Sequence, residues 1–166
     1  MVPLSLSTLS TYRISASRRI EAPAATVYAI LADYREGHPR ILPPAYFGPI
    51  TVEEGGRGAG TVITVEIRAG GRRRAMRGVV SEPEPGRVLL ERYPETNEET
   101  SFTVVPEGPG ACTLTITTTL PGRRGLAGRI ERPLARWLLT RIYREELARI
   151  AAYAPSVRGG EGAPTG

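Results

Sequence analysis

Apolar and polar side chains alternate along residues 11–20, and this period of two predicts a β-strand with one buried face. Apolar residues then recur at helical spacing through residues 24–34, directly after Pro23, which suits the first turn of a helix. Gly37 and the prolines around it end this helix, and a second, short helix is expected at residues 40–42. The first third of the chain therefore predicts a strand followed by two short helices.

Six further strands are predicted in the middle of the chain, each bounded by segments rich in Gly, Pro, Asn or Glu. They cover residues 46–54, 60–68, 72–81, 87–93, 100–105 and 111–120. Because the connections between them are short, chain neighbours are expected to pair in an antiparallel sheet.

A long amphipathic helix is predicted near the C-terminus, and Pro133 either starts its main part or kinks it. Its apolar stripe is formed by Leu126, Ile130, Leu134, Leu138 and Ile142, widened by Trp137, Leu147 and Ile150. The fold class expected is α+β, with a curved antiparallel sheet of about seven strands wrapped around this helix. One domain is predicted at residues 11–154, with an N-terminal extension at 1–10 and a disordered tail at 155–166.

Three consecutive arginines interrupt an otherwise apolar hairpin pattern around Gly70-Gly71, a dipeptide that favours a two-residue turn. With that turn, Arg72 and Arg73 are expected to be solvated at the hairpin tip. Arg74 instead falls on the core face, opposite Ile67. Its head group either reaches water at a cavity mouth or orients a ligand oxygen.

The facing of the other strands follows from their alternation, with one exception. Residues expected to point inward are Phe102, Val104, Leu114, Ile116 and Thr118. The strand at residues 87–93 stays ambiguous, because either Val88, Leu90 and Arg92 or Leu89, Glu91 and Tyr93 face the core. Both choices place a charged group on the concave side, which fits a mostly apolar pocket with a few polar groups.

Composition excludes some functions and disfavours others. All 22 basic residues are arginine, but acidic residues are interleaved with them, so the net charge of +5 does not indicate nucleic-acid binding. Cys112 is the single cysteine, which excludes an intrachain disulfide. No apolar run approaches the roughly 20 residues of a membrane span, and the N-terminus makes a poor signal peptide. A cytoplasmic protein is therefore expected.

Sequence motifs for catalysis and cofactors are weak. His38 is the single histidine, and its polar context "REGHPR" predicts an exposed surface loop. No metal is expected, since neither His38 nor Cys112 has neighbouring ligands in a metal-binding pattern. No cofactor is expected either, because phosphate-binding and dinucleotide-binding glycine motifs are missing from the sequence.

Four stretches give the chain a resemblance to a known superfamily. They are "RRIEAPAATVYAILADY" at 18–34, "GxGT" at 58–61, "VVSEPEPGRVLLERY" at 79–93 and "GACTLTIT" at 110–117, followed by the closing helix. Over residues 11–153 the chain resembles the START-like (SRPBCC) superfamily with its helix-grip fold, and within it the polyketide cyclase/dehydrase-like group. The resemblance implies a cavity between sheet and helix that holds a small hydrophobic or aromatic molecule. The lining expected from it and from the strand facing is Tyr34, Ile41, Tyr46, Phe47, Ile63, Val65, Ile67, Arg74, Met76, Leu90, Phe102, Val104, Leu114, Ile116, Leu134, Trp137, Leu138 and Ile142.

Three function classes remain open. The protein is a carrier or sensor that binds a small ligand, a cyclase/dehydrase-type enzyme, or an interaction module that uses the same groove. In the enzyme, the resemblance implies that an arginine and tyrosines steer a polyketide-like substrate. The groups available for this are Arg74, Tyr34, Tyr46 and either Glu66 or Glu91. A monomer and a homodimer are both compatible with the sequence.

Overall fold

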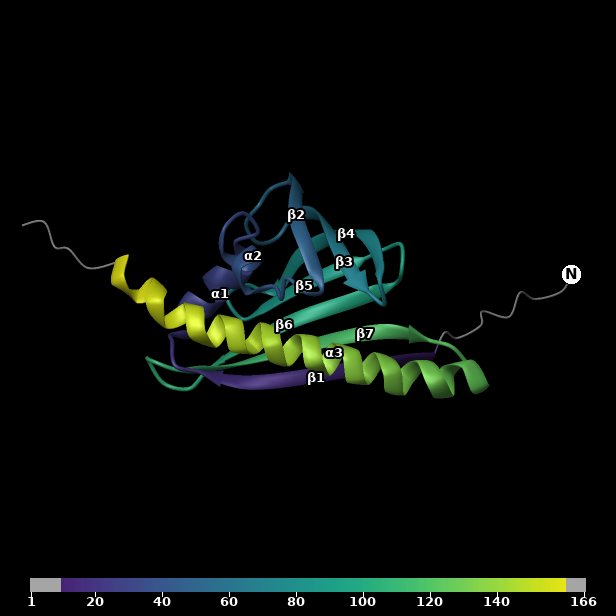
Figure 1. The fold of residues 1–166 in the computed structure, drawn as a ribbon. Helices are drawn as coiled ribbons and strands as arrows, with labels where there is room; N and C mark the ends of the chain where they lie inside the picture. The colour runs from purple at the N-terminus through teal and green to yellow at the C-terminus, as the bar shows by residue number, and fades with distance from the viewer. Residues whose placement is uncertain (1–9, 161–166) are drawn as a thin grey trace, which may run out of the picture.

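A seven-stranded antiparallel sheet and a long C-terminal helix dominate the computed structural model, which describes residues 10–160 (Figure 1). The strands are β1 (Ser10–Ile20), β2 (Phe47–Glu54), β3 (Val62–Ala69), β4 (Arg72–Glu84), β5 (Val88–Tyr93), β6 (Glu98–Pro106) and β7 (Cys112–Gly122). The helices are α1 (Ala24–Ala32), α2 (Gly37–Ile41), α3 (Leu126–Tyr153) and the 3-10 helix η1 (Ala154–Gly160). The strand order is β1-β7-β6-β5-β4-β3-β2, so only β1 pairs with a strand remote in sequence. The predicted fold class is confirmed.

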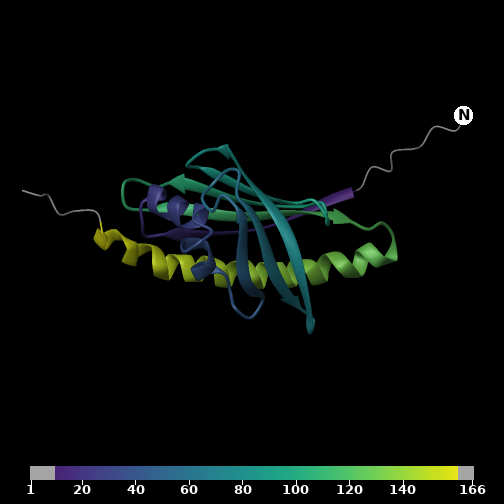
Figure 2. The same ribbon diagram turned by 90° about the horizontal axis from the view of Figure 1, so that it is seen from above.

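The α3 helix runs along one face of the curved sheet, while α1 and α2 lie toward the C-terminal end of α3 (Figures 1 and 2). Irregular register between β2 and β3, and between β4 and β5, accompanies the bending of the sheet. The core between these layers is made of aliphatic side chains such as Ile14, Leu114, Ile116, Leu147 and Ile150, all of them buried. The apolar face of the sheet and the apolar side of α3 pack against each other because this removes both from water.

The β3–β4 hairpin has the register that its sequence predicts. Gly70 and Gly71 both adopt positive φ, 57° and 74°, which the favoured two-residue turn requires and which residues with a Cβ rarely reach. Ile67 consequently pairs with Arg74, and Val65 pairs with Met76. The turn chemistry thus fixes which side of both strands faces the core.

Strand β5 settles the facing that the sequence left open. Leu89, Glu91 and Tyr93 are buried, because Leu89 pairs with the inward-facing Phe102 on β6. Leu90 alternates with them and points to the other face, where it pairs with serines of β4 and β6. Its expected place in the cavity lining is therefore corrected.

The apolar stripe expected along α3 holds only in the C-terminal half of the helix. Ile142, Leu147 and Ile150 are buried, whereas Leu134 and Trp137 are about three-fifths exposed, at 60% and 61%. A spacing of four residues advances roughly 40° around a helix with 3.6 residues per turn. A row of every fourth residue therefore rotates around α3. It faces the sheet near Ile142 and turns progressively away from it toward Leu126. Pro133 lies inside α3 rather than at its start.

The domain boundaries remain a prediction. Ser10, expected in the N-terminal extension, is the first residue of β1, and residues 1–9 lie outside the described part of the chain. The tail expected from residue 155 begins within η1 (Ala154–Gly160), and residues 161–166 again lie outside the described part.

Candidate functional site

A pocket of about 610 Å³ lies between the concave side of the sheet and α3. This volume is within the range of roughly 300–1,000 Å³ that is typical of small-molecule sites. Its apolar wall consists of Leu42, Phe47, Ile50, Ile63, Val65, Ile67, Ala69, Met76, Phe102, Leu120, Ala135, Leu138 and Leu139. Its polar wall consists of His38, Arg72, Arg73, Arg74, Glu91, Tyr93, Glu98, Thr100, Thr118, Tyr143 and Glu146.

The structure places eight of the residues expected at the cavity in this wall. They are Phe47, Ile63, Val65, Ile67, Arg74, Met76, Phe102 and Leu138. Six others are buried in the surrounding core without belonging to the wall, namely Tyr34, Ile41, Val104, Leu114, Ile116 and Ile142. Most of the expected residues therefore lie on the concave side of the sheet or in the core beside it. Some of them line the pocket, and the others are packed behind its wall.

The remaining expected residues lie elsewhere. Tyr46 is partly buried against the core, outside the pocket wall. Leu134 and Trp137 lie on the outer side of α3, for the geometric reason given above. Glu66 lies on the other side of β3 from the pocket, and its carboxylate accepts a hydrogen bond from Arg68 at 2.7 Å. Neither Tyr46 nor Glu66 is therefore brought into the site.

Arginines form the outer end of the pocket. Arg74 lines it, as expected, but Arg72 and Arg73 also belong to its wall although all three side chains are exposed. Arg74 was expected to point inward and Arg72 and Arg73 to be solvated, but in the structure all three are exposed and all three line the pocket. Glu98 lies near Arg74; burial raises the pKa of Glu98, and the positive charge of Arg74 partly offsets this. The mouth carries a positive charge that suits an oxygen-bearing ligand.

His38 is not on a surface loop, which corrects the expectation from its polar context. It belongs to α2 and is only 2% exposed. Its ring stacks on Tyr34 with 4.6 Å between the ring centroids, and its Nδ1–H donates to the Leu31 carbonyl oxygen at 2.7 Å. This hydrogen bond leaves Nε2 directed at Glu91, with 3.7 Å between Nε2 and Oε1. The single histidine therefore sits in the pocket wall beside a carboxylate.

Glu91 is the centre of a buried hydrogen-bond cluster at the inner end of the pocket. Its Oε1 accepts a hydrogen bond of 2.6 Å from the hydroxyl of Tyr34, and its Oε2 accepts one of 2.8 Å from Tyr93. Burial, together with the nearby Glu91 charge, raises the pKa of both tyrosines, so both remain protonated donors. The two donors satisfy both carboxyl oxygens of Glu91, which would be costly to bury without partners.

Glu146 is a second acid in the pocket wall, and it is less well satisfied. It is 3% exposed, and its Oε1 has no hydrogen-bond partner among the described residues. Burial raises the pKa of Glu146 to about 8, and the negative charge of Glu91 adds to this effect. At neutral pH Glu146 is therefore largely protonated and carries an O–H group that a ligand oxygen can accept from.

A hydroxyl chain continues the polar end along α3 and the sheet. The hydroxyl of Tyr143 is hydrogen-bonded to Thr118, which in turn is 2.7 Å from the Thr100 hydroxyl. Burial raises the pKa of Tyr143 as well. The pocket thus has an arginine mouth, an apolar middle and an inner end with acids, phenols and one imidazole. Among the described residues, no group of three or more His, Cys, Asp or Glu side chains is arranged to hold a metal ion.

Two of the polar wall residues that sequence reasoning missed carry a recognisable signal. Leu138, Ile142, Glu146 and Ile150 are each four residues apart on α3, so Glu146 is an acid within an otherwise apolar row. His38 has a weaker signal, because an apolar pair at residues 41–42 follows its polar neighbours closely. Glu98 and Tyr143 were outside the expected lining, and no pattern around them distinguishes them from surface residues.

The curved sheet and the long helix lying across it, with the pocket between them, form the helix-grip arrangement expected from the sequence. The chain belongs to the family described as polyketide cyclase/dehydrase and lipid transport, whose model matches residues 11–155. No curated protein matches the sequence. No described helix is both long enough and apolar enough to span a membrane.

Solved structures share this fold over nearly their whole length. The solution structure of KanY protein is 28% identical, with 88% of this chain and 99% of that chain covered and a TM-score of 0.76. The Zhui aromatase/cyclase from Streptomyces sp. R1128 is 19% identical, with coverages of 93% and 100% and a TM-score of 0.73. A norcoclaurine synthase from Thalictrum flavum is 16% identical, with coverages of 90% and 98% and a TM-score of 0.67. The last two likenesses show the shared fold alone.

Proposed function

We propose that this protein binds a small hydrophobic or aromatic molecule that carries hydrogen-bonding oxygens at both ends. The observation that supports this is the pocket of about 610 Å³, with apolar walls between an arginine mouth and the inner acid Glu146. The apolar middle favours a ring system or chain through the hydrophobic effect. The protonated Glu146 donates to an oxygen at one end, and Arg74 to an oxygen at the other.

The depth of the pocket favours a small ligand over a protein partner. An interaction module that used the same groove would have a shallow groove filled by side chains, with an apolar rim around it. The walls here instead include Glu91 and Glu146, two buried acids that a flat protein surface would not reach. A carrier or sensor is therefore the function we adopt.

Native mass spectrometry of the purified protein tests the proposal, followed by titration with a dihydroxyanthraquinone as the probe. We expect either a co-purified small molecule or binding of the probe. Ala135→Phe fills part of the pocket from α3 and should abolish binding, whereas Ala127→Phe on the exposed first turn of α3 should not. If Ala135→Phe is folded and binds as tightly as the unaltered protein, the ligand does not occupy this pocket.

The buried acids favour a second candidate, a dehydrase or cyclase acting on a bound β-hydroxy ketone. In such a dehydration a base removes a proton from the carbon beside the carbonyl, and the C–O bond breaks. An acid gives its proton to the leaving hydroxyl, which departs as water and leaves a carbon–carbon double bond. In this proposal His38 Nε2 or Glu91 acts as the base, since the two groups lie 3.7 Å apart, and the protonated Glu146 acts as the acid.

Turnover of such a substrate separates the enzyme from the carrier. In the enzyme, the rate should fall as the pH rises above about 8, because Glu146 then loses the proton it must give. Glu146→Gln should abolish turnover at every pH and still bind the ketone. If the unaltered protein binds the ketone without turning it over, the enzyme function is excluded and the carrier function remains.

A further inference from the structure

The outer side of α3 carries an exposed apolar row that the pocket does not use. Leu126, Ile130, Leu134 and Trp137, here called the outer stripe, are between 60% and 78% exposed. Spacings of four, four and three residues place them on one side of the helix. Isolated exposed apolar residues are ordinary, but four large ones in one helical row form a patch that indicates an interaction.

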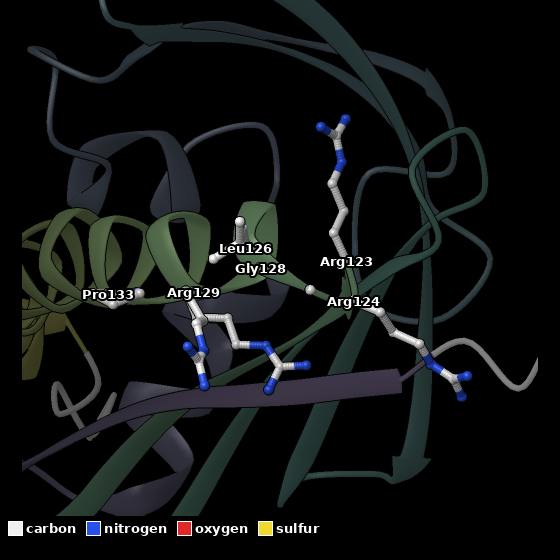
Figure 3. A pocket seen from close by; sticks show the side chains of 8 residues that line it. Arg123, Arg124, Leu126, Gly128, Arg129 and Pro133 are labelled. Carbon is white, nitrogen blue, oxygen red and sulfur yellow. The ribbon is translucent and has the colours of Figure 1, made fainter.

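Arginines surround the outer stripe. Between residues 123 and 144 the chain has seven arginines and a single acid, Glu131. Figure 3 shows Arg123, Arg124 and Arg129 extended in different directions around the first turn of α3, beside Leu126. Farther along the helix, Arg141 lies 5.9 Å from the centre of the Trp137 ring. One contiguous surface therefore combines large apolar side chains with a strong positive charge.

The shape of the molecule leaves this surface accessible. The sheet covers only the opposite side of α3, where Ala135, Leu138 and Leu139 line the pocket. In Figure 2 the β3–β4 hairpin extends past α3 on the side away from the sheet. Arg72 and Arg73 directly follow its Gly70-Gly71 turn. A flat partner lying on the outer stripe would therefore also meet the arginines at the mouth of the pocket.

Three kinds of partner are compatible with an exposed apolar row, and charge separates them. Arg132 is directed at β1, where it donates to the Ser10 hydroxyl, and Arg123 pairs with Glu131. The arginines left on the surface would still face those of a second copy, and like charges repel one another. A nucleic acid matches the charge but offers little to aliphatic side chains such as Ile130 and Leu134. An anionic lipid surface uses both features, because acyl chains take up the apolar row and head groups pair with the arginines.

We propose that the outer stripe and its flanking arginines dock this protein peripherally on an anionic lipid surface. Leu126, Ile130, Leu134 and Trp137 enter the boundary between head groups and acyl chains, and the arginines contact the phosphates. Arg72 and Arg73 reach the same surface, so the pocket mouth opens toward the membrane. The proposal stands apart from the ligand function, since it uses the other side of α3.

Trp137 provides a direct test because it is the single tryptophan of the chain. The full-length protein is titrated with vesicles of phosphatidylglycerol and phosphatidylcholine, and with vesicles of phosphatidylcholine alone. We expect a blue shift of the emission with the anionic vesicles, and quenching when their acyl chains are brominated. Addition of about 0.5 M salt should reverse binding, because the ionic part is screened. Absence of the shift and of the quenching with anionic vesicles overturns the proposal.

Matched variants distinguish vesicle binding through the outer stripe from binding caused by the overall positive charge or by any exposed apolar residue. Leu134→Ser should weaken vesicle binding about tenfold, whereas Val105→Ser, an exposed apolar position on β6, should change it less than about twofold. Replacing Arg129 and Arg136 by glutamine should weaken binding about fivefold per arginine. The same change at the exposed Arg13 and Arg18 of β1 should have a smaller effect. Equal losses in both arginine pairs would overturn the assignment to α3.

The competing partners have their own signatures. A dimer in sedimentation velocity that Leu134→Ser dissociates, without quenching by brominated lipid, would assign the stripe to a second copy and overturn the proposal. Binding of a DNA duplex that is insensitive to Leu134→Ser, again without lipid quenching, would overturn it in favour of a nucleic acid. Both measurements use the same purified protein as the vesicle titration.

Discussion

Glu146 and Glu91 are two acids in one pocket with different hydrogen-bonding surroundings. Each carboxyl oxygen of Glu91 accepts a hydrogen bond, one from Tyr34 and one from Tyr93. Glu146 lies in the same pocket wall with an unpartnered Oε1, so its neutral form is favoured. A buried acid with a raised pKa is a group that both acid–base chemistry and oriented ligand binding can use.

The raised pKa of Glu146 predicts a pH-dependent stability. The folded protein holds this proton up to about pH 8, whereas the unfolded chain releases it near the ordinary value of 4.5. Between these values the folded state binds more protons, so its stability falls as the pH rises. Glu146→Gln removes that loss and should be more stable than the unaltered protein at pH 9, by on the order of 3 kcal/mol. The two proteins should be similar at pH 5.

Urea unfolding at the two pH values measures this difference. Glu145→Gln is the matched control, because this neighbouring acid on α3 is not buried. The control should follow the unaltered protein at both pH values. If Glu146→Gln gains no stability between pH 5 and pH 9, the pKa of Glu146 is not raised.

Arg74 at the pocket mouth gives a prediction for ligand affinity. Arg74→Met should weaken binding of the dihydroxyanthraquinone by about 1.5 kcal/mol, the lower end for a charge-assisted hydrogen bond, because the side chain is exposed. Arg72 and Arg73 also line the pocket and are unsuitable controls. Arg77→Met on the same strand is suitable, since Arg77 pairs with Glu53 on the outer face at 2.8 Å. Isothermal titration that gives equal losses for Arg74→Met and Arg77→Met would exclude an orienting role for Arg74.

Among the elements, those with strong local signals were predictable from the sequence. The β3–β4 hairpin is an example, because Gly70-Gly71 fixes the turn and the alternation then fixes both faces. Strand β5 was not predictable, since it presents a charged residue on either face and its register depends on its partners. His38 was misplaced for a similar reason: the sequence around it is polar, and only the packing of α2 against Tyr34 buries it.

The two halves of α3 differ in what they contribute to stability. Leu147 is 2% exposed in the core, whereas Leu134 belongs to the outer stripe. Leu147→Ala should therefore destabilise the fold by about 3 kcal/mol, through lost burial and a cavity. Leu134→Ala, the same change on the same helix, should cost less than about 0.5 kcal/mol. Chemical denaturation of the two variants is the measurement, and similar losses would mean that the first half of α3 packs against the protein after all.

At the scale of the whole molecule, the site depends on residues from distant parts of the chain. α2 brings His38, β5 brings Glu91 and α3 brings Glu146 to one end of the pocket. The family resemblance and the strand pattern predicted that a cavity exists between sheet and helix. The meeting of these three side chains could not be predicted, because it depends on the curvature of the sheet and the rotation of α3 about its axis.

The extent of the folded unit is a prediction at the same scale. Ala154 is fully buried, and its backbone N–H continues the helical hydrogen bonding by donating to the Ile150 carbonyl oxygen. Beyond it, Val157 is 43% exposed, and the Ser156 hydroxyl donates to the carbonyl oxygen of Tyr153, three residues earlier in the chain. Truncation after Ala154 therefore removes little buried apolar surface, and the melting temperature should change by less than about 2 °C.

Truncation after Leu147 is the matched comparison, because it also removes Ile150 and Ala154 from the core. Loss of two buried apolar residues and the last turns of α3 should lower the melting temperature by more than about 10 °C or prevent folding. Differential scanning calorimetry of both truncated proteins locates the boundary. A large loss in the first truncation would show that the segment after residue 154 is part of the folded unit, because nothing else distinguishes that protein from the full chain.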